Sequence, residues 1–360
     1  MSETDKTNRR HDLDWLRVIA LSILIVYHIA VAFQPWGTYI FFITNEDHLQ
    51  DLWTLMQIVN IWRIPILFTI SGMGVYFAMQ RRNWKQLIKD RTVRILTPLI
   101  FGSVVIVPIS FIIFFNYYNR PVPDWISNPG HLWFLGNIFF YVLVLLPVFN
   151  YFNNRPNNIF FKLVSDVVRK PFGIIFIFAL PVVTEAVLIN PKDYPLFVSS
   201  LHGLIIGLVC FFSGFVLVSL KEDYWSAVKK AKFITLVIGL SLYIIRIFYA
   251  DIYPSHTLMN LFVSFESANW MLSAFGLAAS YLNKPSRWLA YLSSAVYPAY
   301  IVHLPVQQFF SSVIFPLSIP ASVKFVTLVV TTFGGSLVIF EILKRLKWIR
   351  FLFGMKSFQK

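Results

Sequence analysis

An arginine and a histidine share one apolar segment near the start of the chain. The stretch "LDWLRVIALSILIVYHIAVAF" runs from Leu13 to Phe33 and carries Arg17 and His28. Eleven residues at about 100° each return to nearly the same helical face, and at about 1.5 Å per residue they span roughly 16 Å. A helix here presents a permanent cation at one end and an imidazole at the other. Neutral imidazole accepts and returns a proton near neutral pH, so His28 is a candidate general base.

Both residues could also have a role other than catalysis or ligand binding. An arginine near the end of a membrane helix can extend its side chain to lipid phosphate, as Arg17 could. A histidine inside a bundle can be a hydrogen-bonded packing residue, as His28 could. Neither residue alone decides between the two interpretations.

Three further arginines strengthen the chemical interpretation. Arg63 lies in "NIWRIPILFTISGMGVYFAMQRR" (60–82), too deep to reach the membrane surface easily, so we expect it to face the bundle interior or a water-filled cavity. Arg91 and Arg94 belong to "RTVR" and fall on one helical face at the inner edge of the third apolar segment. Guanidinium groups there match phosphate oxygens, although ordinary charge at the cytoplasmic surface would also explain them.

Four more residues could bind a ligand. His131 and Trp133 begin the fourth apolar segment, where an interfacial aromatic belt or packing is the alternative explanation. Glu266 enters the eighth segment from the outer side. His303 lies within the ninth segment, where a structural or ligand-contacting role is favoured over a catalytic one.

The composition predicts helices in a membrane around these residues. The chain has 360 residues, of which 57% are hydrophobic, 18% aromatic and only 13% charged. Average globular chains are about a quarter charged, so the sequence predicts an all-α polytopic membrane protein. Runs of apolar residues predict ten transmembrane helices, at roughly 13–33, 53–79, 94–115, 131–150, 171–189, 200–219, 233–250, 262–281, 288–313 and 321–343.

The basic residues predict the orientation of these helices. Counting Arg17 with the amino-terminal segment, alternate polar gaps hold 26 of the 31 Lys and Arg, and the opposite gaps hold two. The positive-inside rule therefore places both termini in the cytoplasm. The net charge of +14 is then a topology signal with anionic lipid as its partner, and it does not indicate nucleic acid.

No gap is large enough for a soluble domain, so we divide the chain into three parts. We expect a short cytoplasmic tail (1–11), one membrane domain (12–346) and a basic cytoplasmic tail (347–360). The single cysteine, Cys210, cannot form an intrachain disulfide or a cysteine-based metal site. The histidines show no metal-ligand spacing, so we expect no metal and no bound cofactor.

These motifs together resemble the membrane acyltransferase 3 family. "LDWLRVIALSILIVYH" is similar to the family's first-span signature, "WRIPILFTISG" resembles its second span, and "RTVR" matches its Arg-x-x-Arg motif. "HLWFL" (131–135) and "YLNKPSRWLAYLSSAVYPAYIVHLP" (281–305) are most similar to the branch of periplasmic glucan succinyltransferases. The resemblance covers nearly the whole chain and is to the stand-alone form of the family, without a fused esterase-like domain.

The resemblance implies a multi-pass O-acyltransferase of the bacterial cytoplasmic (inner) membrane. Cytoplasmic acyl-CoA would be a co-substrate, and a hydroxyl of a cell-envelope carbohydrate on the outer face would be the acceptor. His28 would be the general base, and Arg17, Arg91 and Arg94 would bind the acyl-CoA phosphates. The candidates for contact with the acceptor sugar are His131, Trp133, Glu266 and His303. The acyl group, acetyl or succinyl, stays open, and so does the role of Arg63, either at an oxyanion or at a succinyl carboxylate.

The alternative is a transporter or exporter of an anionic sugar or metabolite. Arginine and histidine inside membrane helices suit that class as well. The pairing of Arg17 and His28 with the Arg-x-x-Arg motif favours the enzyme.

Overall fold

The computed structural model describes residues 9–122, 124–125, 127–249 and 255–355, which contain helices and no strand. The all-α polytopic fold predicted from the sequence is confirmed. The α-helices are α2 (His11–Val31), α3 (Gln50–Asn60), α4 (Arg63–Met79), α5 (Trp84–Arg91), α6 (Thr97–Phe101), α7 (Val107–Tyr117), α8 (Trp133–Asn154), α9 (Ile159–Val168), α10 (Gly173–Ile189), α11 (Leu201–Ser219), α12 (Glu222–Phe248), α13 (His256–Tyr281), α14 (Arg287–Ile314) and α15 (Ala321–Arg345). Short helices of other types lie between or after them: the π-helical η2 (Thr92–Leu96) and η3 (Gly102–Ile106), and the 3-10 helices η1 (Gly37–Ile40), η4 (Gly130–Leu132) and η6 (Arg350–Phe353).

Most of these helices are able to cross a bilayer. Among the described residues, eight helical segments are long and apolar enough, and nine if α9 and α10, which meet at 115°, form one span. α13 has 26 residues, which is also sufficient in length, but it buries polar side chains that lower its hydropathy. The described residues therefore show eight or nine of the ten spans predicted. The orientation of the termini stays a prediction.

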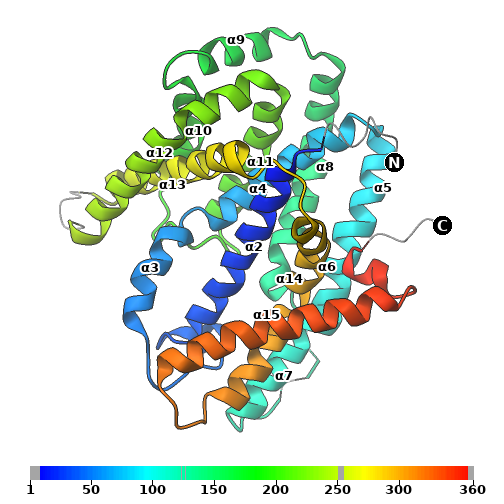
Figure 1. The fold of residues 1–360 in the computed structure, drawn as a ribbon, viewed down its shortest axis with the longest axis vertical. Coiled ribbons are helices and arrows are strands. Elements are labelled where there is room, and N and C mark those ends of the chain that lie inside the picture. Colours follow the sequence, from blue (N-terminus) through cyan, green and yellow to red (C-terminus); the bar gives the residue numbers. More distant parts are fainter. Residues whose placement is uncertain (1–8, 123, 126, 250–254, 356–360) are drawn as a thin grey trace. The chain divides into compact units, whose positions relative to one another are not determined.

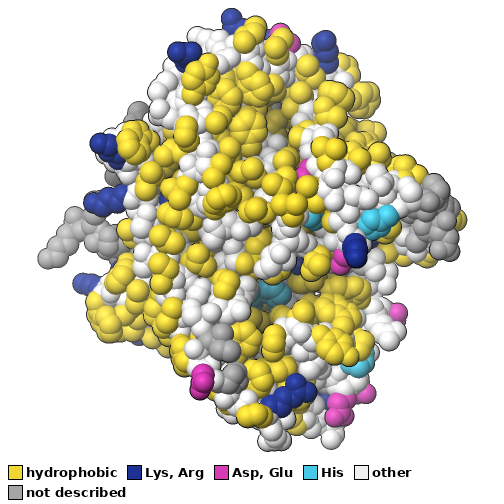
Figure 2. Space-filling model, turned by 180° about the vertical axis from the view of Figure 1, so that it is seen from behind, with side chains coloured by type: hydrophobic (Ala, Val, Ile, Leu, Met, Phe, Trp, Pro, Cys, Tyr) yellow, Lys and Arg dark blue, Asp and Glu magenta, His cyan; other side chains and the backbone are white. Residues whose placement is uncertain are grey.

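The surface has the composition that lipid requires. Figure 2 shows hydrophobic side chains over much of the visible surface, with Lys and Arg in separate places. One apolar face of α12 is exposed along its length and consists of Phe233, Ile234, Val237, Leu240, Ile244 and Phe248. A continuous exposed apolar face of this kind is unfavourable in water and neutral in a bilayer.

The structure differs from the sequence prediction at several polar gaps. α5 and α9 lie within gaps 81–94 and 153–170, and α12 begins at Glu222 rather than near 233. The segment expected to be a basic tail, 347–360, contains η6, which packs against α6 and η2 and buries Phe353. Residues 1–8 of the predicted amino-terminal tail lie outside the described part of the chain.

The chain forms two compact units, and each is described by itself. Unit 1 comprises Met1–Ala20, Asn60–Leu87 and Tyr141–Ser293. In it α12 runs beside α13, α10 packs against α13 and α11, and α4 packs along α11 (Figure 1). The α4–α11 contact is backbone to backbone: a methyl group added at Gly72 would lie 1.9 Å from the Phe211 carbonyl oxygen. Such close approach by small residues is typical of helices that associate in lipid.

Unit 2 comprises Leu21–Val59, Ile88–Phe140 and Ser294–Lys360. Its core surrounds the carboxyl-terminal half of α2, and its buried members are Ile25, Ile29, Ala32, Phe33, Ile43, Phe114, Ile314, Phe315 and Leu328. Gln308 of α14 fixes the loop that follows α2, because its side chain accepts from the Ile43 amide (3.1 Å) and donates to the Phe41 carbonyl (2.7 Å).

We predict that the gaps rich in Lys and Arg are cytoplasmic. Single cysteines at the exposed positions Ser127 and Lys192 should react with an impermeant thiol reagent in intact spheroplasts, whereas cysteines at Lys85 and Asn157 should react only after lysis. The native Cys210 is buried and gives a low background. The reverse pattern of labelling would invert the proposed orientation.

Candidate active site

α2 brings His28 to a defined place in unit 2. Asp12 and Asp14 occupy the first turn of α2, where negative charge is favourable, and His28 lies in its last turn. The carbonyl groups of a last helical turn lack partners within the helix. The side-chain amide of Gln307, on α14, donates to the His28 carbonyl at 2.9 Å. This bond fixes the end of α2 to α14, and the His28 ring is left half-buried.

His28 contacts His303, a histidine 275 positions later in the sequence. The distance from His28 Nδ1 to His303 Nε2 is 2.9 Å. The two ring planes differ by 5°, and their centroids are 5.1 Å apart. Together these values place the two nitrogens between the ring centres, edge to edge in a shared plane, which is good hydrogen-bond geometry. The structure therefore pairs the predicted base with a residue that we expected on the acceptor side.

His303 is fixed through its second nitrogen. Its Nδ1 lies 2.6 Å from the carbonyl oxygen of Tyr300, one turn earlier in α14, and the ring is fully buried. Both nitrogens of His303 are therefore engaged within unit 2. In the described part of the chain, no group of three or more His, Cys, Asp or Glu side chains has a geometry that could hold a metal ion.

His131 supports the same part of α14. Pro305 has no backbone N–H, so the Ile301 carbonyl lacks its usual helical partner. His131 Nε2 lies 3.2 Å from both the Tyr300 and the Ile301 carbonyl oxygens, and Tyr300 Oη donates to the His131 carbonyl at 2.5 Å. His131 is 9% exposed and packs edge-on against His303. The structure thus places His131 beside the His28–His303 pair, with Nε2 bound to backbone.

The other two candidates for contact with the acceptor sugar, Trp133 and Glu266, lie in different units. Trp133 is the first residue of α8 in unit 2, where it is half-buried and contacts Phe134. Glu266 lies in unit 1, 1% exposed, and its carboxylate accepts from Arg246 at 2.7 and 3.0 Å and from Trp270 at 3.3 Å. Sequence reasoning missed this ion pair. The signal was available, since the apolar segments that form α12 and α13 carry charges of opposite sign, Arg246 and Glu266.

The three candidates for binding acyl-CoA do not lie within one unit. Arg17 belongs to unit 1 and contacts Asp14 at 3.4 Å, whereas Arg91 and Arg94 belong to unit 2. Arg94 pairs with Asp90 at 3.0 Å. Arg91 ends α5, and the π-helical turn η2 follows directly, so the two arginines do not have strict α-helical spacing. Single π-helical turns inside helices are frequent at functional sites.

Arg63 begins α4 in unit 1 and is 6% exposed. Its Nη1 donates to the backbone carbonyl of Asn60 at 2.9 Å and also to the Asn60 side-chain oxygen. The chain is not helical at residues 61–62, and Ser267 donates to the carbonyl of Ile61 at 2.9 Å. A break between α3 and α4 therefore places the buried cation at a helix start.

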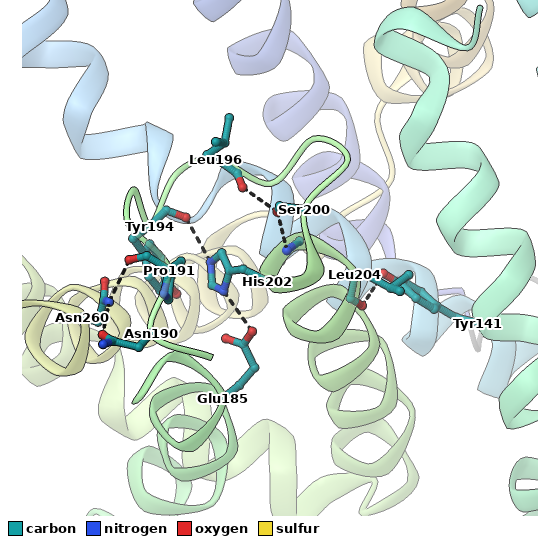
Figure 3. Close-up of polar contacts among 11 residues, drawn as sticks. Tyr141, Glu185, Asn190, Pro191, Tyr194, Leu196, Ser200, His202, Leu204 and Asn260 are labelled. Atoms are coloured by element: carbon teal, nitrogen blue, oxygen red, sulfur yellow. Dashed lines mark hydrogen bonds and ion pairs between the residues drawn. The ribbon is translucent and has the colours of Figure 1, made fainter. Parts of the chain in front are cut away.

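A second polar cluster in unit 1 was not predicted. Glu185 of α10 and His202 of α11 are both buried, with His202 Nδ1 2.9 Å from Glu185 Oε1 (Figure 3). His202 Nε2 donates to the carbonyl of Tyr194 at 3.0 Å. Asn260 of α13 donates to the Asn190 side chain at 2.9 Å in the same loop. The cluster fixes the loop 190–200 to three helices, which indicates a structural role.

Comparisons with known proteins agree with the motifs. The family described as acyltransferase domain matches residues 10–341. The glucans biosynthesis protein C of Salmonella heidelberg (strain SL476) is 22% identical over 377 residues, which cover 97% of this chain and 95% of that protein. The protein of the same name from Salmonella schwarzengrund (strain CVM19633) is 21% identical over 375 residues, with the same two coverages. No solved structure matches.

We predict that His202→Leu destabilises the protein. The substitution leaves the Glu185 carboxylate and the Tyr194 carbonyl buried without their partner, at a cost of about 1–3 kcal/mol. Thermal unfolding of the detergent-solubilised protein should show a lowered midpoint. His48→Leu, at an exposed position, is the control and should leave the midpoint unchanged. Equal midpoints for both variants would contradict a structural role for the cluster.

Proposed function

Because this chain belongs to the membrane acyltransferase 3 family, we propose that it transfers an acyl group from cytoplasmic acyl-CoA to a hydroxyl of a cell-envelope carbohydrate. Glucans biosynthesis protein C, to which it is similar over nearly its whole length, supports a glucan as the acceptor class and the bacterial inner membrane as the location. Acyl-CoA is a co-substrate here, and no bound cofactor takes part.

The observation that carries this proposal is the placement of His28. It lies on one continuous helix, α2, with Arg17 eleven residues earlier, and its ring is half-buried and held by His303. A histidine that is oriented on one side and still partly accessible is suited to general base catalysis. A purely structural histidine, such as His202, is buried and bonded to the protein through both nitrogens.

The chemical step is acyl transfer from a thioester. His28 removes the proton of the acceptor hydroxyl while the hydroxyl oxygen attacks the thioester carbonyl carbon. The new C–O bond forms, and the electron pair of the C=O double bond moves to the carbonyl oxygen. When the intermediate collapses the C–S bond breaks, and the proton on His28 passes to the leaving CoA thiolate. His28 thus ends neutral, and the products are the ester and free CoA.

Four arginines have proposed roles that rest on the sequence motifs. Arg17, Arg91 and Arg94 bind the CoA phosphates, since guanidinium groups form strong charge-assisted bonds with phosphate. Arg63 stabilises the oxyanion or, with a succinyl donor, pairs with the free carboxylate. The burial of this permanent cation inside an apolar segment supports either role.

We predict that His28→Gln abolishes acyl transfer. Glutamine keeps a polar side chain that accepts hydrogen bonds but does not take up a proton near neutral pH. General base catalysis contributes about 10²–10⁴-fold, so acyl-CoA-dependent release of CoA by the purified protein should fall by that factor. Binding of acyl-CoA should persist. Wild-type rates in this variant would remove His28 from the mechanism, and no CoA release by the wild-type protein would favour the transporter.

We predict that Arg94→Ala weakens acyl-CoA binding. Loss of one charge-assisted phosphate contact costs about 1.5–3 kcal/mol, or roughly tenfold or more in affinity. Titration with a non-hydrolysable acyl-CoA analogue measures the change, and Arg91→Ala should behave in the same way. Asp90→Asn is the matched control, because it breaks the Asp90–Arg94 ion pair and keeps the arginine. Similar affinities in Arg94→Ala and Asp90→Asn would contradict a phosphate contact.

A further inference from the structure

We infer that His303 is a positioning residue that selects Nε2 of His28 as the basic nitrogen. This inference rests on the proposed function, in which His28 is the general base. His303 was expected to contact the acceptor sugar or to be structural. In this inference it instead determines which ring nitrogen of His28 carries the hydrogen.

The first step concerns the proton on His303. Its Nδ1 lies 2.6 Å from the Tyr300 carbonyl oxygen, and a carbonyl oxygen only accepts hydrogen bonds. Nδ1 must therefore carry the hydrogen of this bond. In a neutral imidazole one ring nitrogen donates and the other accepts, so Nε2 of neutral His303 presents a lone pair.

The second step transfers this constraint to His28. His303 Nε2 lies 2.9 Å from His28 Nδ1, and the two rings share a plane within 5°. Since His303 Nε2 accepts, His28 Nδ1 donates and carries the hydrogen. Neutral His28 then has its lone pair on Nε2, which points away from His303. The base that meets the hydroxyl is therefore Nε2, and the opposite tautomer would lose the hydrogen bond.

The third step concerns the state after proton uptake. His28 then carries hydrogen on both nitrogens, and its Nδ1–H donates to His303 as a charge-assisted bond, which is stronger than the neutral one. His303 therefore favours the protonated form that arises during the reaction. The same logic applies to the group that orients the histidine of a serine protease triad, where the wrong tautomer costs about 10⁴-fold in rate.

α14 is built to hold His303 in this geometry. Its ring is fully buried, and His131 binds the Tyr300 carbonyl and the carbonyl that Pro305 leaves free. Gln307, one turn after His303, binds the backbone of His28 itself. The side chain and the backbone of His28 are thus both hydrogen-bonded to α14.

Two substitutions at His303 test the inference. His303→Phe keeps a ring of similar size and removes the acceptor, whereas His303→Gln keeps an oxygen that accepts from His28 Nδ1. We expect kcat for CoA release to fall roughly 10²–10⁴-fold in His303→Phe, with an unchanged KM for acyl-CoA. His303→Gln should recover at least about tenfold of that loss.

Controls separate positioning from packing. Unfolding midpoints of both variants are measured beside His202→Gln, which alters a buried histidine in unit 1 and should lower stability without changing kcat per folded molecule. Equal loss of kcat in His303→Phe and His303→Gln, or wild-type kcat in His303→Phe, would overturn the inference. If His303→Phe does not accumulate, His303→Gln decides alone: activity as low as that of His28→Gln overturns it.

The same assay distinguishes the inference from the proposed function. If His28→Gln is inactive and His303→Phe is fully active, the general base stands and the positioning role fails. If His28→Gln is as active as the wild type, the proposed mechanism itself fails, and the result at His303 no longer concerns catalysis.

Discussion

Polar groups inside a bilayer must find their partners within the protein, because lipid tails offer neither donors nor acceptors. Two of the buried charges in the described part of the chain illustrate that constraint. Glu266 accepts from Arg246 and Trp270, and buried Lys324 donates to Asn45 and to the Phe315 carbonyl. Such pairs join helices, and breaking one leaves a buried group that is costly to keep unpaired.

The same constraint explains how α14 organises unit 2. Pro305 removes one N–H from the helix and so leaves a carbonyl that needs a donor from outside, which His131 supplies. The neighbouring Tyr300 carbonyl takes both His131 and His303. Pro305 thus accounts for the free Ile301 carbonyl that His131 binds, and the Tyr300 carbonyl beside it joins His131 and His303.

His28 and His202 differ in exposure. His202 uses both ring nitrogens within unit 1 and is 2% exposed. The ring of His28 is half-buried, and its Nδ1 is hydrogen-bonded to His303. The difference is consistent with a structural role for His202 and with the proposed role of His28.

The sequence by itself determined the class of the protein and several helix positions, because membrane spans depend on local runs of apolar residues. The spacing of Arg17 and His28 was also local, since one uninterrupted helix sets it. The partner of His28 was not predictable, because 275 residues separate it from His303 and apolar periodicity carries no information on which helices meet. Glu185 and His202 are only 17 residues apart, but they lie on two different helices, and apolar periodicity does not show which faces of those helices meet. Only the tertiary structure decided these contacts, since each depends on the packing of one helix against another and on hydrogen bonds that need angles as well as distances.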